Sequence, residues 1–283
     1  MEINNLLENG FIILDKWQGP TSRDVTATVK KILGVRIAGH SGTLDPQVSG
    51  VLIITLNNAC KIMPLLQNLD KEYVGVMHLH KDVDDVLLGK AIKNFTGKIK
   101  QRPPVRSAVA RKERFRTVHS FEILERNGRD VLFRISCQAG TYVRVVCHSI
   151  GTVVGGAHMS ELRRTKVGPF SEKQCVKIHD LADAWAEQKE NELKKMILPV
   201  ESAIPHVKKV ILKDDAVRSI TNGSPLYSSG VERADDIKKD DMVAVMHSGA
   251  LVAIGRAKSN KSDFEKTKGP IISTDRVIAK NSK

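Results

Sequence analysis

Two short apolar runs near the N-terminus, residues 11–15 and 51–56, predict strands that are buried on both faces. Between them, apolar residues recur at helical spacing from Val25 to Leu33, and Gly34 is placed to end that helix. Gly19-Pro20-Thr21-Ser22 supplies the turn and the cap before it. The chain is therefore expected to open as strand, turn, helix, loop and strand.

Alternation of apolar and polar positions predicts two further strands, at residues 71–80 and 131–137. After the second strand we expect a turn at residues 138–140 and a helix capped by Thr141, whose first turn contains Arg144. Residues 101–117 are expected to be irregular because Pro103-Pro104 excludes helix and sheet interior. Residues 180–197 are expected to form one helix, and residues 201–205 a linker.

From Lys208 onward, the pattern changes to short strands and tight turns. Residues 242–246 and 251–257 pair as a hairpin across Ser248-Gly249, after a strand at 210–212 and a short helix at 214–220. This pattern predicts a small β-barrel appended to a larger domain. We place the boundary between 1–205 and 206–283.

The 283-residue chain has a formal net charge of +13, which favours a polyanionic partner. The charge alone does not show whether this partner is DNA, RNA or an anionic membrane. No apolar window is long enough to span a bilayer, and the N-terminus lacks a signal-peptide pattern, so we expect a cytoplasmic protein without a membrane partner. The four cysteines are widely scattered, which favours free thiols over a zinc site.

The most distinctive stretch holds one carboxylate, Asp45, among Gly39, Gly42 and Gly50. The glycines permit sharp bends, and Pro46 keeps Asp45 out of helical conformation. Functionally, this would be a carboxylate held on a shaped loop at the edge of a core strand. The alternative is a surface Asp-Pro turn, which is the commoner case for such a sequence.

Basic residues, mostly arginines, are the second group of candidate functional residues. Arg144 would sit where the helix macrodipole disfavours a cation, and it is suited to pairing with a carboxylate such as Asp45; the alternative is a solvated helix edge. Residues 101–117 are either a clamp for a phosphate backbone or a solvated run of charge. The cations of that segment are Arg102, Arg106, Arg111, Lys112, Arg114 and Arg116.

Four blocks, taken in order, resemble the TruB/dyskerin family of pseudouridine synthases. They begin at Gly39, Lys71, Gly140 and Ala157, and read GHSGTLDP, KEY, GTYVR and AHMSELRRT. The part after Val210, with Asn222-Gly223, looks like a PUA domain. Two departures from the family pattern are Trp17 and Arg23 in the first motif, KWQGPTSR.

The resemblance implies an α+β fold, namely a catalytic domain with a mixed, largely antiparallel sheet flanked by helices, plus a C-terminal PUA β-barrel. It implies that the chain isomerises uridine in RNA without cofactor or metal. Asp45 would be the catalytic carboxylate, Arg144 its partner in a buried pair, and Tyr73 the ring beneath the flipped base. His40 would help to displace the base. The same resemblance implies substrate contacts by Tyr142, Leu162, Arg163 and Arg164, and RNA binding by Gly223.

Within the family, Met77-His78-Leu79-His80 and Pro103-Pro104 resemble the archaeal dyskerin branch. That branch implies a box H/ACA guide RNA, two small companion proteins and a kink-turn-binding protein as partners, with rRNA and tRNA as substrates. The alternative from another class is a non-catalytic RNA-binding scaffold. The alternative among enzymes is a stand-alone tRNA synthase that acts without a guide.

Overall fold

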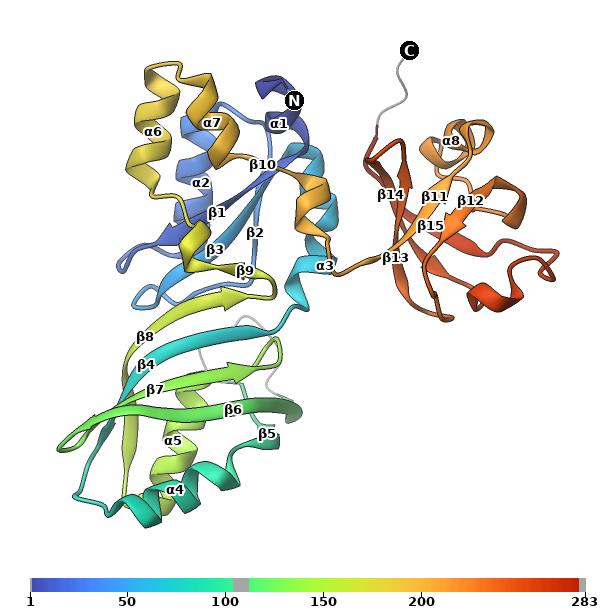
Figure 1. Ribbon diagram of the computed structural model, residues 1–283. Helices are drawn as coiled ribbons and strands as arrows, with labels where there is room; N and C mark the ends of the chain where they lie inside the picture. The colour runs from blue at the N-terminus through green and yellow to red at the C-terminus, as the bar shows by residue number, and fades with distance from the viewer. Residues whose placement is uncertain (1, 104–111, 280–283) are drawn as a thin grey trace.

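The computed structural model describes residues 2–103 and 112–279. The two sheets form two lobes that are joined by a single extended segment of the chain. The N-terminal lobe is much the larger (Figure 1). No helix in the described ranges is long and apolar enough to cross a bilayer. The predicted α+β class, with a mixed sheet domain followed by a small β domain, is confirmed.

The larger sheet has the strand order β10-β1-β3-β8-β4-β7-β6-β5, with β2 added beside β3 and β9 beside β8. Among these strands, only β3 and β8 pair in parallel, and every other ladder is antiparallel. The strand bounds are β1 Gly10–Lys16, β2 Ala38–Ser41, β3 Ser49–Leu56, β4 Lys71–Leu79, β5 Gly97–Gln101, β6 Arg114–Asn127, β7 Asp130–Cys137, β8 Ala157–Val167, β9 Phe170–Ser171 and β10 Leu198–Pro199.

Strands β1 and β3 are buried on both faces, as their unbroken apolar runs predict. Ile12 and Leu52 pack under helices α2 (Ser22–Leu33), α6 (Ile178–Ala186) and α7 (Glu190–Met196). The opposite face packs against η1 (Asn57–Ile62) and α3 (Met63–Gln67). Helix α2 begins with a capping box at Thr21 and ends at Gly34, in the left-handed conformation, as expected.

Strands β4 and β7 bury one face only. Phe133 and Met77 lie on that face, against α4 (Asp85–Asn94) and α5 (Val143–Val154). The other face carries polar residues such as Arg134 of β7, which forms an ion pair with Glu122 of the neighbouring β6. The two halves of the sheet meet where Gly50 of β3 pairs with Arg164 of β8.

The smaller domain is a five-stranded sheet, β12-β11-β13-β14-β15, with α8 (Asp214–Thr221) packed on it. Its strands are β11 Lys208–Leu212, β12 Val231–Ala234, β13 Met242–His247, β14 Ala250–Ala257 and β15 Ile272–Val277. The predicted hairpin across Ser248-Gly249 is present as β13 and β14.

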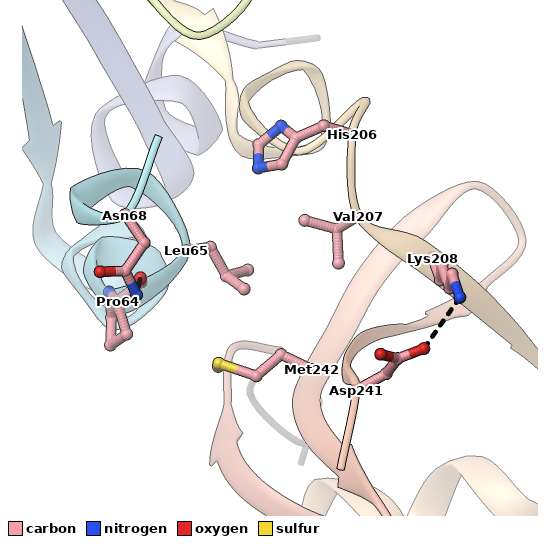
Figure 2. A pocket seen from close by; sticks show the side chains of 8 residues that line it. All are labelled: Pro64, Leu65, Asn68, His206, Val207, Lys208, Asp241 and Met242. Atoms are coloured by element: carbon pink, nitrogen blue, oxygen red, sulfur yellow. Dashed lines mark hydrogen bonds and ion pairs between the residues drawn. The ribbon is translucent and has the colours of Figure 1, made fainter. Parts of the chain in front are cut away.

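The two domains share apolar contacts, so the expected linker at 201–205 is not free chain. Ala203 and Ile204 are fully buried in a cluster that includes Met246 and Leu251 of the smaller domain. The Leu251 N–H donates to the Glu201 carboxylate at 3.0 Å. A pocket of about 300 Å³ lies at this junction, between Leu65 on α3 and Met242 on β13 (Figure 2).

Three local predictions are wrong. The helix expected over 180–197 breaks into α6 and α7, because Gln188 adopts a positive φ of 54° and turns the chain. Thr141 does not cap α5; its hydroxyl donates to the Gln138 carbonyl at 2.7 Å, and Tyr142 is the N-cap residue. The segment 101–117 is partly strand, since β6 begins at Arg114.

Candidate active site

Asp45 lies in the loop between β2 and β3, as predicted. A turn is closed by the Val48 N–H, which donates to the Asp45 carbonyl at 3.0 Å. Gly50 ends the loop with φ of 103°, and a Cβ there would lie 2.2 Å from the carbonyl oxygen of Arg164. Only glycine meets both requirements, so the loop closes tightly on β8.

Two buried cations fix the shape of this loop. The Lys16 ammonium donates to the carbonyls of Trp17, Pro46 and Val48 at 2.8, 3.1 and 2.9 Å. The Arg164 guanidinium, 1% exposed as a residue, donates to the carbonyls of Val51 and Gly42 at 2.7 and 3.0 Å. Burial lowers the pKa of Lys16, and the nearby Asp45 charge opposes that shift.

Arg144 forms an ion pair with Asp45, in which the Arg144 Nη2 donates to the Asp45 Oδ2. The pairing expected from the first helical turn is therefore present. The expected burial is wrong, because the two side chains are 53% and 56% exposed. The loop and the first turn of α5 meet at the surface, so the pair is open to a large partner, and it contributes at most about 1 kcal/mol to folding.

Tyr73 lies on β4, half-buried, and packs against the core cluster that contains Leu162. It is paired in register with Arg164. Burial raises the pKa of the Tyr73 phenol, and the nearby Arg164 charge opposes that shift. The phenol is thus kept protonated at neutral pH, beside the loop that carries Asp45.

His40 lies on β2, between two hydroxyl groups. Its Nδ1 is 3.1 Å from the Thr26 hydroxyl, and its Nε2 is 3.3 Å from the Thr43 hydroxyl. Burial lowers the pKa of His40, and Arg164 and Arg23 lower it further. The imidazole is therefore neutral at pH 7 and keeps one donor and one acceptor.

The other residues expected to touch substrate are held by protein contacts. Arg163 binds Asp15 with two bonds of 2.9 and 3.0 Å and also donates to Glu172 at 2.8 Å. Tyr142 is half-exposed at the start of α5, and its backbone exchanges hydrogen bonds of 3.1 and 3.2 Å with the Gln101 amide. Leu162 is buried, at 7% exposure.

The predicted RNA-binding residues that the structure describes lie in two places. Arg106 and Arg111 lie outside the described residues. Arg102 and Lys112 are exposed near the start of β6, and Arg114 and Arg116 are half-buried within that strand. Gly223 follows α8 in the smaller domain, with φ of 84°.

Sequence reasoning missed the roles of Lys16 and Lys71. Lys71 is buried on β4, and its ammonium donates to the carbonyls of Gln67, at 2.7 Å, and Leu69. Burial, then the Arg164 charge, lowers the pKa of Lys71 to about 8. A usable signal was present for Lys71, because it shares the phase of Tyr73 and Met77 in the alternating strand, whereas Lys16 directly follows the predicted strand 11–15.

Among residues 2–103 and 112–279, no group of three or more His, Cys, Asp or Glu side chains is arranged to hold a metal ion. On β4, the His78 Nδ1 lies 2.7 Å from the Asp130 Oδ1, and the His80 Nε2 lies 2.9 Å from the His158 Nδ1. The site thus consists of one open carboxylate paired with arginine, a protonated phenol and a neutral imidazole around a braced loop. Such a set suits nucleophilic or acid–base chemistry at an exposed surface.

Three family models match this chain between residues 30 and 278. The model for the N-terminal domain of the TruB family pseudouridylate synthases matches residues 30–90 and 81–143. The model for the tRNA pseudouridylate synthase B C-terminal domain matches residues 144–205, and the PUA domain model matches residues 208–278.

Similar proteins include a "Probable tRNA pseudouridine synthase B" of Methanopyrus kandleri, which is 46% identical over 98% of this chain and 84% of its own length. The protein of the same name in Methanococcus aeolicus is 43% identical over 98% of this chain and 89% of its own length.

Solved structures give the same result. A chain of a Cbf5-Nop10-Gar1 complex superposes with a TM-score of 0.93 at 45% identity, over 99% of this chain and 88% of that one. A chain of an H/ACA RNP bound to a substrate RNA superposes with a TM-score of 0.91 at 43% identity, over 100% and 89%. The chain belongs to the TruB family of pseudouridine synthases and is an isomerase with a PUA domain.

Proposed function

We propose that Asp45 is the catalytic carboxylate of this synthase, and that Arg144 keeps it ionised and aimed at the target uridine. The observation that carries the proposal is the ion pair between them, on a loop braced by Lys16 and Arg164. A charge-assisted bond from a planar guanidinium favours the ionised carboxylate and fixes its orientation. Because the pair is open before RNA arrives, the substrate itself would exclude water from it.

The reaction breaks the bond between N1 and C1′ of the uridine and forms a bond between C5 and C1′. The C5 proton leaves and N1 gains a proton, so no oxidant, reductant or external group enters the balance. Asp45 either attacks the sugar or abstracts a proton from it, and the arrangement of the residues accommodates both. The target base must first leave its stack to reach the carboxylate.

The neighbouring residues have distinct parts in this proposal. Tyr73 stacks on the flipped base and, being protonated, has a proton to exchange during the rearrangement. His40, neutral and bounded by two hydroxyls, enters the space that the base leaves. Leu162, in the core cluster against which Tyr73 packs, would line the space for the flipped base, and Tyr142 would border that space at the start of α5.

Arg163 and Arg164 would act on substrate binding through the shape of the site. Arg164 donates to carbonyls on both sides of the Asp45 loop, and Arg163 ties β8 to β1 through Asp15. Their guanidinium groups are thus occupied by the protein before RNA binds. We therefore assign both residues a positioning part in substrate binding.

For the substrate, we propose guide-directed modification of rRNA as the main activity, with guide-free modification of the tRNA T-arm as the second. The similar structures of a Cbf5-Nop10-Gar1 complex and of an H/ACA RNP with substrate RNA support the first. The name tRNA pseudouridine synthase B, borne by relatives at 43–46% identity, supports the second. Guide RNA, two small companion proteins and a kink-turn-binding protein would be the partners, in the cytoplasm.

RNA would be held by the cations of residues 102–116 and by the smaller domain, with 206–283 as the RNA-binding unit and Gly223 in its turn after α8. The net charge of +13 supports this arrangement. Reconstitution tests the substrate assignment: the purified protein is assayed on rRNA fragments and on an unmodified tRNA transcript, with and without guide and companions. We expect rRNA to be modified only by the full set. Equal rRNA modification by the protein alone would contradict the guide-directed proposal, and no isomerisation of any RNA would favour the scaffold alternative.

A further inference from the structure

One aromatic side chain next to the Asp45 loop has no part in the core. Trp17 directly follows β1 and is 42% exposed as a residue. The aromatic and cation–π contacts of the described residues involve Phe11, Phe115, Phe121 and the histidines of β4 and β8, and none involves Trp17. A lone exposed aromatic ring is ordinary on a protein surface, so its position decides what it does.

The position of Trp17 is tied to that of Asp45. The Lys16 ammonium donates to the carbonyls of both Trp17 and Pro46, so these two backbone segments are neighbours. The Gly19 N–H also donates to the Pro46 carbonyl, at 2.9 Å. The backbone that carries the indole is therefore fixed beside the residue that follows the candidate catalytic carboxylate.

Two cations lie near the site that Trp17 borders. Arg23, exposed on the first turn of α2, lies close enough to His40 to lower its pKa, and Arg144 pairs with Asp45. Arginines hold phosphates, and an exposed aromatic face beside them is the arrangement by which proteins bind unpaired nucleotides. An aromatic face accepts any base, because every base has a π face.

We propose that the Trp17 indole stacks on a nucleotide adjacent to the target uridine and holds the RNA while that uridine is flipped. Flipping removes one stacking partner from each neighbouring base, and the indole replaces one of them. The inference rests on the proposed function, because it requires RNA to enter over the Asp45 loop. It makes Trp17 a substrate-binding residue whose loss weakens the affinity for RNA.

The chain has two tryptophans, Trp17 and Trp185, so fluorescence separates them. Trp185 lies on α6, partly buried against the core. In Trp185→Phe, only the Trp17 indole emits, and titration with an unmodified tRNA transcript, or with guide and rRNA fragment, should quench it. In Trp17→Phe, only Trp185 emits, and the same RNA should leave the signal nearly unchanged.

Affinity gives the second readout. Trp17→Ala should raise the Kd for RNA by about 5- to 100-fold, as for loss of one stacked base, while Trp17→Phe stays within a few-fold. A 2-aminopurine next to the target uridine should lose its stacking quench in Trp17→Ala.

Unquenched Trp17 emission at saturating RNA would overturn the inference, and this arm does not depend on the folding of any Trp17 variant. An unchanged Kd for Trp17→Ala would overturn it as well. Neither result touches the proposed function, which fails separately if the wild-type protein isomerises no RNA.

Discussion

Arg144 and Asp45 are 99 residues apart in the chain, yet they form an ion pair at the edge of the braced loop. The pair is more than half exposed, so it does little for stability. In the proposed function its contribution is orientation, because both partners would already be placed when RNA covers them.

Replacing Arg144 should therefore separate activity from stability. Arg144→Ala should lower the single-turnover rate by about 100-fold or more and change the free energy of unfolding by less than about 1 kcal/mol. Arg144→Lys should restore activity only in part, because an ammonium lacks the planar fork. Full activity in the lysine variant would contradict oriented pairing, and a large loss of stability in the alanine variant would contradict an open pair.

Gly50→Ala should be among the most damaging single-methyl changes in the protein. The new Cβ would lie 2.2 Å from the Arg164 carbonyl, in a backbone with φ of 103°. We expect a loss of about 3 kcal/mol or more in the free energy of unfolding, measured by urea denaturation. Gly128→Ala is the matched control, because its φ is 57° and no atom of the described residues lies within 4 Å of the place its methyl group would take. It should cost about 1–2 kcal/mol, and equal losses in the two variants would contradict the close approach at Gly50.

Lys71 should make stability depend on alkaline pH. Its pKa is about 8 in the folded protein and 10.5 ordinarily, so the unfolded chain binds more protons between these values. The free energy of unfolding of the wild type should consequently rise with pH in that window, by up to about 3 kcal/mol relative to Lys71→Met. Urea unfolding of both proteins at several pH values checks this, and a constant difference from pH 8 to pH 10.5 would show that Lys71 does not titrate early.

RNA affinity should fall steeply as salt rises. Lys112 is exposed beside β6, and Lys112→Gln should reduce the slope of log K against log salt by about 1. Lys189, which pairs with Glu187 between α6 and α7, is the control, and its glutamine variant should keep the wild-type slope. Filter binding over a range of salt concentrations distinguishes the two, and equal slopes in all three proteins would remove Lys112 from the binding surface.

Much of the fold follows from the sequence. The unbroken apolar runs of β1 and β3 predict strands that are buried on both faces, and the helical spacing of apolar residues in α2 predicts a helix with one buried face. The pairing of Asp45 with Arg144 was also predictable, from a cation placed against the helix dipole. The exposure of the pair was not, since it depends on how far the loop and α5 stand out from the sheet. The break between α6 and α7 was missed because Gln188, without glycine or proline nearby, takes the left-handed conformation.

The contacts by which Lys16 holds the Asp45 loop could not be predicted from the sequence pattern either. Its carbonyl partners are the adjacent Trp17 and, from the Asp45 loop, Pro46 and Val48, and the register of β1 against β3 brings this loop to the ammonium. The domain boundary at residue 205 stays a prediction, because buried Ala203 and Ile204 pack against both parts.

Asp45→Asn tests the central claim most directly. Release of tritium from RNA labelled at C5 of uridine is followed for the wild type and for this variant, at RNA concentrations that saturate both. The amide keeps the shape of the side chain and removes its charge, so RNA affinity should stay within a few-fold while tritium release falls below detection. Release at a rate near that of the wild type would contradict Asp45 as the catalytic carboxylate.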